Sequence, residues 1–135
     1  DREAHYSKMY VVYQRLAGAS PTWGHSATSE EGPVPDWILY IDCDAFFTDF
    51  ETSIEDLLHT YATPRGTDTE GAHFLVAEDP GGINTGVFMI RRSPWSMSFL
   101  ERVIRSRFMV AWDQSMFFWD MVRGALDIDL ADFAA

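Results

Sequence analysis

The apolar positions of the chain fall into short runs separated by polar segments, and several of these runs predict β-strands. The clearest is Ile38–Ile41, which follows Pro33 and Pro35 and ends at a pair of aspartates. A run of large residues this short, bounded in this way, is typical of a buried strand. The segments 9–13, 73–77 and 87–90 are rich in β-branched and aromatic residues and predict further strands, with 73–77 near a sheet edge.

Other segments show helical spacing. Ser93 and Pro94 are typical of an N-cap and a first helical residue, so they predict the start of a helix. One face of that helix carries an apolar stripe that we expect in the core, made of Trp95, Phe99, Leu100, Val103 and Ile104. Its arginines, Arg102 among them, are expected on the solvated side. Strands and helices therefore share one chain, which favours an α/β fold.

Three more helical segments are predicted. Residues 2–8 resemble the end of a helix that precedes the strand at 9–13. Ser53 and Asp56 form a capping-box pattern that opens a short helix through Tyr61. Asp113 is expected to cap a last helix that is apolar nearly all round and hence buried. Residues 18–35, rich in Gly, Ser, Thr, Pro and Glu, are expected to form a polar loop or insertion.

Composition limits the class of protein. A chain of 135 residues with 47% hydrophobic residues has enough material for one domain with one core. The net charge of −11 argues against binding to a nucleic-acid backbone or to an anionic membrane surface. Cys43 is the only cysteine and cannot form an internal disulfide. No apolar run reaches the roughly 20 residues of a membrane helix, and a first residue Asp1 suggests a piece of a longer protein.

Asp42 and Asp44 follow the strand at 38–41 directly. Residues two apart in extended backbone point to the same side, so both carboxylates can reach one cation. Hard oxygen ligands suit Mg²⁺ or Mn²⁺, and α/β sheets bind ligands at the carboxyl ends of their strands. Solvated turn aspartates are the alternative, and they are the default for the second Asp-x-Asp copy at 127–129.

Two further stretches carry candidate binding residues. Asn84 lies between Gly82 and Gly86, where glycines allow backbone to approach a ligand and the amide can bind sugar hydroxyls. An Asn that only satisfies a turn explains the pattern equally well. Asp113 and Gln114, at the start of the last helix, are either an ordinary cap or groups that bind a hydroxyl-rich ligand. A lone His25 in the polar loop is expected to be solvated.

Three segments in order resemble the galactosyl/xylosyltransferase family, which includes plant xyloglucan xylosyltransferases, galactomannan galactosyltransferases and yeast mannan-chain α-mannosyltransferases. They are DWILYIDCDAFFTD from residue 36, GINTGVFMIR from residue 82 followed by SPWSMSFL, and WDQS from residue 112. The resemblance covers about residues 36–122. It implies a GT-A-like (Rossmann-like) α/β fold with a mostly parallel sheet flanked by helices, here incomplete, in one domain or fragment spanning 1–135.

The resemblance also implies roles for individual residues. Asp42 resembles the aspartate that contacts ribose and metal-bound water, and Asp44 resembles the direct ligand of a Mn²⁺ or Mg²⁺ ion. Asn84, Thr85 and Gly86 match the segment that lines the sugar and acceptor side of the site. Asp113 and Gln114 match the catalytic pair beside the donor sugar.

The function implied is transfer of a hexose or pentose from a nucleotide-sugar donor to a glycan acceptor, with retention of anomeric configuration and with a divalent cation. The family further implies the Golgi lumen and a membrane anchor outside this chain. Two departures favour an alternative. The family's first strand is missing, and no histidine follows His73 to supply a further metal ligand. The alternative is a non-catalytic or truncated remnant that keeps the fold and at most binds saccharide.

Overall fold

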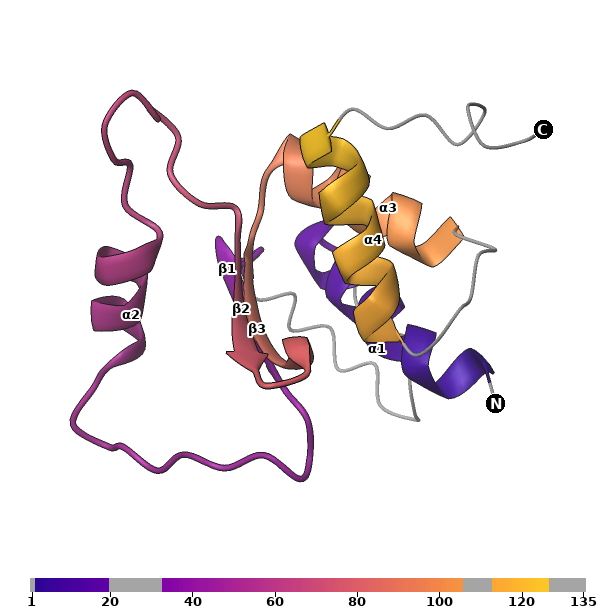
Figure 1. Cartoon of the computed structure of the whole chain (residues 1–135), viewed down its shortest axis with the longest axis horizontal. Helices are drawn as coiled ribbons and strands as arrows, with labels where there is room; N and C mark the ends of the chain where they lie inside the picture. Colours follow the sequence, from indigo (N-terminus) through magenta and orange to yellow (C-terminus); the bar gives the residue numbers. More distant parts are fainter. Residues whose placement is uncertain (1, 20–32, 106–112, 127–135) are drawn as a thin grey trace.

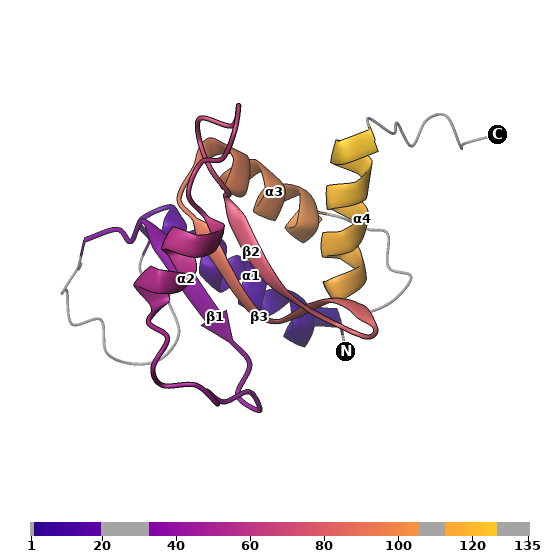
Figure 2. The same ribbon diagram turned by 60° about the vertical axis from the view of Figure 1, so that its left-hand side comes forward.

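The computed structural model describes residues 2–19, 33–105 and 113–126. In this part of the chain a three-stranded sheet is covered on one face by three helices, while a fourth, short helix stands on the other side (Figure 1). Turning the molecule by 60° shows the same arrangement, with the short helix in front of the sheet (Figure 2). The α/β class predicted from the sequence is confirmed. No described helix is long and apolar enough to cross a membrane.

The sheet consists of β1 (Trp37–Ile41), β2 (Phe74–Asp79) and β3 (Gly82–Arg91) in the order β1-β3-β2, and both pairings are antiparallel. The prediction of a mostly parallel sheet is therefore wrong for the described strands. Pro80 and Gly81 alone connect β2 to β3, and a two-residue connection can only join antiparallel neighbours. The predicted edge position of the 73–77 segment is confirmed, because β2 lies at one side of this sheet.

The strand β1 is only half-buried, although the apolar run predicted a buried strand. It lies at the other edge of the described sheet and has a single neighbour, β3. The central strand β3 is the one with fully buried side chains, among them Phe88 and Ile90. The degree of burial of a strand depends on its position in the sheet. A run of apolar residues does not encode that position.

The first helix, α1 (Arg2–Leu16), includes the segment 9–13 that the sequence predicted as a strand. That prediction is wrong. Met9, Val12 and Leu16 are buried at helical spacing, and α1 packs against α3 (Pro94–Arg105). Burial of this face outweighs the β propensity of a β-branched and aromatic segment, since propensities are weak compared with tertiary packing.

Helices α3 and α4 (Asp113–Leu126) complete the core layer. Phe74, Phe88, Phe99 and Phe117 come from β2, β3, α3 and α4, and their ring centroids lie 5.1–5.7 Å apart in five pairs. Such tilted and edge-on pairs are favourable aromatic geometries. One aromatic cluster thus joins four elements.

The predicted burial of the last two helices needs two corrections. In the α3 stripe, Phe99, Leu100 and Val103 are fully buried as expected, but Trp95 is partly exposed. The helix α4 is not buried all round, because Phe118 is more than half exposed while Phe117 is fully buried. A single packed face, against β3 and α3, accounts for this pattern.

The short helix α2 (Ile54–Tyr61) has the predicted capping box. The Ser53 hydroxyl accepts a hydrogen bond from the Asp56 amide, at 3.1 Å, and the Asp56 carboxylate accepts from the Ser53 amide, at 3.3 Å. The carboxylate also accepts from the Ser53 hydroxyl. These local bonds allow α2 to form with no fully buried residue of its own.

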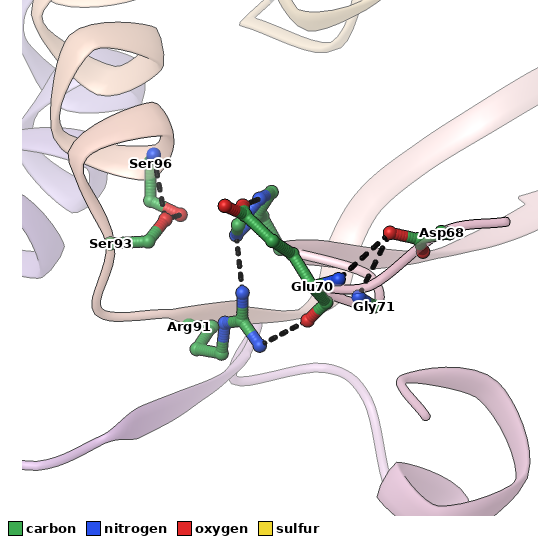
Figure 3. Close-up of polar contacts among 7 residues, drawn as sticks. Asp68, Glu70, Gly71, Arg91, Ser93 and Ser96 are labelled. Atoms are coloured by element: carbon green, nitrogen blue, oxygen red, sulfur yellow. Dashed lines mark hydrogen bonds and ion pairs between the residues drawn. The ribbon is translucent and has the colours of Figure 1, made fainter. Parts of the chain in front are cut away.

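A hydrogen-bond network joins the segment before β2 to the end of β3 (Figure 3). Arg91 donates to the Glu70 carbonyl at 2.7 Å and contacts the ring of His73 at 2.9 Å. The Asp68 carboxylate accepts from the amides of Glu70 and Gly71. Because Arg91 pairs with Trp37 at the start of β1, this network lies at the opposite end of the sheet from Asp42.

Candidate functional site

The strand β3 contains a bulge that brings two predicted motifs together. Val76 of β2 pairs with Phe88, but its neighbour Ala77 pairs with Asn84, so residues 85–87 have no partner on β2. On the other side, the Asp42 amide donates to the Gly86 carbonyl at 2.7 Å. An extra segment of this kind bends a strand and re-aims its side chains. Here it places Gly86 beside the end of β1.

Gly86 fills the space between Asn84 and Asp42. A Cβ atom on this residue would lie 2.9 Å from the Asn84 Oδ1 atom and 3.0 Å from the Asp42 Oδ2 atom. These distances leave no room for a side chain. The backbone of Gly86 has no positive φ, so glycine is required here by close approach and not by backbone conformation.

The amide of Asn84 is engaged at both ends. Its nitrogen donates to the Asp79 carboxylate at 2.8 Å, and its oxygen accepts from the Gly86 amide at 2.8 Å. These bonds support the turn-stabilising interpretation of Asn84. An amide side chain has two donor hydrogens and two acceptor sites, so one of each on Asn84 has no partner among the described residues. Thr85 is buried, and its carbonyl oxygen accepts a hydrogen bond from Lys8.

The carboxylate of Asp42 is half-exposed and asymmetrically bonded. Its Oδ1 atom accepts a hydrogen bond from the Tyr40 hydroxyl at 2.6 Å and lies 3.8 Å from the Lys8 ammonium. Its Oδ2 atom accepts no hydrogen bond from the described residues. This oxygen is the one that faces Gly86.

Asp44 lies in a turn after β1. The Ala45 amide donates to the Asp42 carbonyl at 3.0 Å, so the extended backbone stops at Ile41 and the alternation of side chains stops with it. The carboxylate of Asp44 is exposed and forms no hydrogen bond with the described part of the chain. The assignment of Asp42 and Asp44 as metal ligands stays a prediction. The two residues lie in a turn, so the alternation of side chains along a strand no longer supports it.

The donor set suits a hard divalent cation. Oδ2 of Asp42 and the carboxylate of Asp44 are oxygens with free lone pairs, and Mg²⁺ or Mn²⁺ is commonly held by one or two carboxylates with water and phosphate oxygens in the other positions. Within residues 2–19, 33–105 and 113–126, no group of three His, Cys, Asp or Glu side chains gathers to hold a metal. Cys43 is exposed between the two aspartates.

The remaining predicted residues are less closely connected to this site. Asp113 begins α4, and its side chain lies outside the described part of the structure, as do His25 and the second Asp-x-Asp copy at 127–129. Gln114 is half-buried in the first turn of α4. Figures 1 and 2 show that α4 begins at the end of the sheet where the β2–β3 hairpin lies, which is also the end that carries Asp42.

Sequence reasoning missed Lys8 and Tyr40. A signal existed for Tyr40, because it lies two residues before Asp42 on one strand and therefore shares its face. None existed for Lys8, which is 34 positions away on a helix of which a third, residues 9–13, was predicted as a strand. The positively charged ammonium group of Lys8 lies 3.8 Å from the Asp42 carboxylate.

The comparisons with known proteins identify the family. A model of the galactosyl transferase GMA12/MNN10 family matches residues 26–117. The chain belongs to this family. The match spans the strand β1, the Asp42–Asp44 turn, the bulge in β3 and the start of α4, which carry the predicted site residues.

Two curated relatives from rice are similar to part of the chain. Each is described as probable glycosyltransferase 6, one from Oryza sativa subsp. indica and one from subsp. japonica, and each is 32% identical over 75 residues. The aligned segment is 51% of this chain and 14% of each rice protein. The chain therefore corresponds to a minor part of these relatives. No solved structure matches it.

Proposed function

We propose that the chain forms the donor-binding part of a retaining glycosyltransferase that transfers a sugar from a nucleotide sugar to a glycan acceptor. The observation that carries this proposal is the meeting of Asp42, Gly86 and Asn84 at one end of the sheet, in a chain that belongs to a galactosyl transferase family. Those residues come from two motifs about 40 positions apart in the sequence. Their contact is what a ligand site built from both motifs requires.

Asp42 and Asp44 would hold a divalent cation, with Mn²⁺ as the preferred ion and Mg²⁺ as the alternative. When bound, such a cation offsets the negative charge that a diphosphate leaving group develops. Oδ2 of Asp42 accepts no hydrogen bond from the described residues and faces Gly86, where no side chain covers it. It is therefore the oxygen best placed for this role.

The chain's other polar groups have separate tasks in this proposal. Asn84 keeps one amide hydrogen and one oxygen lone pair for hydroxyl groups of a sugar. Asp113 and Gln114, at the start of α4, would face the donor sugar, where a carboxylate stabilises positive charge at the anomeric carbon. The same proposal includes a GT-A fold for the parent protein, in which the three described antiparallel strands are part of a larger sheet.

Calorimetric titration tests this function. The chain is titrated with UDP-sugars and with GDP-mannose, each with and without Mn²⁺, and the Asp42→Ala, Asp44→Ala double variant is compared. We expect binding that requires Mn²⁺ and that weakens at least about tenfold in the double variant, since charge-assisted contacts are lost. The matched control is the Asp127→Ala, Asp129→Ala variant, which removes the second copy of the motif and should bind normally.

The outcomes separate the two hypotheses drawn from the sequence. Metal-dependent binding together with sugar transfer to an oligosaccharide acceptor supports the enzyme. Binding of saccharide without a nucleotide and without Mn²⁺ supports the non-catalytic remnant and refutes the transferase. Equal losses in both double variants would contradict the assignment of the site to Asp42 and Asp44.

A further inference from the structure

The two oxygens of the Asp42 carboxylate have different surroundings. Oδ1 accepts from the Tyr40 hydroxyl at 2.6 Å and lies 3.8 Å from the Lys8 ammonium, whereas Oδ2 faces Gly86 without a hydrogen bond from the described residues. A carboxylate bonded at one oxygen cannot rotate freely about its Cβ–Cγ bond. The orientation of Oδ2 is therefore set by the groups that hold Oδ1.

Tyr40 is itself fixed by the core. Its ring stacks on that of Phe88, with centroids 5.1 Å apart and an interplanar angle of 18°. Phe88 is buried in the central strand and belongs to the aromatic cluster that joins β2, β3, α3 and α4. The hydroxyl of Tyr40 is thus held at the end of a ring that the core has already positioned.

Lys8 reaches the same point from α1. Its side chain is 12% exposed, its ammonium lies 5.1 Å from the centroid of the Tyr40 ring, and it donates to the Thr85 carbonyl at 3.2 Å. A cation over an aromatic face is attracted to it. Lys8 therefore joins α1 to the bulge of β3 and to Asp42 at once.

We propose that Tyr40 and Lys8 are positioning residues that hold Asp42 by Oδ1, so that Oδ2 is presented to the ligand. The identity of that ligand, a divalent cation carrying a nucleoside diphosphate, rests on the function proposed above. Groups behind a ligating side chain orient it and raise affinity without touching the ligand themselves. Holding the carboxylate before binding also avoids an entropy cost at the moment of binding.

The test compares variants that remove one supporting group each. Tyr40→Phe deletes the hydroxyl and keeps the stacked ring, and Lys8→Met deletes the ammonium and keeps the aliphatic stem. The affinity of the chain for Mn²⁺ with UDP or GDP is measured by calorimetry, and the unfolding temperature is measured in parallel. We expect Tyr40→Phe to lower the affinity about tenfold, as for other changes behind a ligand, with little change in the unfolding temperature.

Two controls distinguish positioning from general damage. Tyr61→Phe removes the hydroxyl of an exposed tyrosine on α2 and should leave the affinity unchanged. Lys8→Arg keeps the positive charge and should restore most of the affinity that Lys8→Met loses. A structural role alone would lower the unfolding temperature of the Tyr40 and Lys8 variants without changing their affinity, and that result would overturn the proposal.

The same titration separates this proposal from the function on which it rests. If the unaltered chain binds and the Tyr40→Phe and Lys8→Met variants bind equally well, the positioning roles are refuted and the proposed function stands. No metal-dependent binding by the folded, unaltered chain refutes both.

Discussion

Arg102 of α3 binds the buried carboxylate of Asp120 on α4 through two nitrogens. Its Nε atom lies 3.0 Å from both carboxylate oxygens, and one terminal nitrogen lies 2.8 Å from Oδ2. The hydrogen bond to Asp120 raises the pKa of the Arg102 guanidinium above its ordinary value. The predicted solvated position of Arg102 is confirmed, because its side chain is 42% exposed. Its bond to Asp120, which connects two core helices, was not predicted.

The first prediction concerns this ion pair. Arg102→Met keeps much of the aliphatic stem but leaves Asp120, only 8% exposed, without its partner. We expect the free energy of unfolding to fall by about 2 kcal/mol, the cost of an unpaired buried charge, as measured by urea denaturation. Arg105→Met is the matched control, because its pair with Glu101 spans 3.6 Å at the surface and is worth at most about 0.5 kcal/mol. Equal losses in the two variants would contradict the prediction.

The second prediction concerns the space at Gly86. Gly86→Ala places a methyl group 2.9–3.0 Å from the Asn84 and Asp42 side chains, which must then move. We expect Mn²⁺-dependent nucleotide binding in calorimetry to weaken at least about tenfold, since displacement of a ligating side chain has costs of this order. At Gly124, in α4, an added Cβ meets nothing within 4 Å. Gly124→Ala should therefore bind normally. Equal binding by Gly86→Ala and Gly124→Ala would refute a role for the close approach at Gly86.

The third prediction tests the helix at residues 9–13. Val12 is 3% exposed, whereas its neighbour Val11 is only partly buried. We expect Val12→Ala to lower the free energy of unfolding by about 2 kcal/mol, for two lost methyl groups and the cavity they leave, and Val11→Ala to lower it by about half as much. Thermal or urea unfolding followed by circular dichroism measures both. A larger loss of stability in Val11→Ala than in Val12→Ala would favour the strand that the sequence predicted.

The fourth prediction concerns pH and the start of α2. Hydrogen bonds from the Ser53 hydroxyl and then from the Ser53 amide hold the pKa of Asp56 below its ordinary value of 3.8. A lowered carboxyl pKa in the folded state contributes stability that is fully present above pH 3.8 and is lost as the pH falls through the folded-state value. We expect the amide signals of α2 in NMR spectra to show fraying in that acidic range.

Two variants check the origin of this pH dependence. Asp56→Asn should remove it, because the residue no longer titrates. Ser53→Ala should destabilise the helix by about 1 kcal/mol at neutral pH, the usual cost of losing an N-cap side chain. An unchanged acid transition in Asp56→Asn would assign the effect to another group such as Asp49, since hydrogen bonds from the Thr52 hydroxyl and the Glu51 amide also lower its pKa.

The sequence by itself determined the features that depend on neighbouring residues. The capping box at Ser53 and Asp56, the start of α3 at Pro94 and the edge strand β2 were all predicted and all found. The α/β class followed from the same local patterns. These features are encoded within a few residues, because hydrogen bonds of caps and turns join groups that are close in the chain.

Tertiary structure alone decided the rest. The choice of helix for residues 9–13, the antiparallel pairing of β1 with β3, the partner of Arg102 and the position of Lys8 beside Asp42 all depend on residues 18 to 88 positions apart. Burying Met9, Val12 and Leu16 against distant elements outweighs the weak local preference for a strand. Burial and long-range pairing are properties of the assembled core, and no short stretch of sequence specifies them.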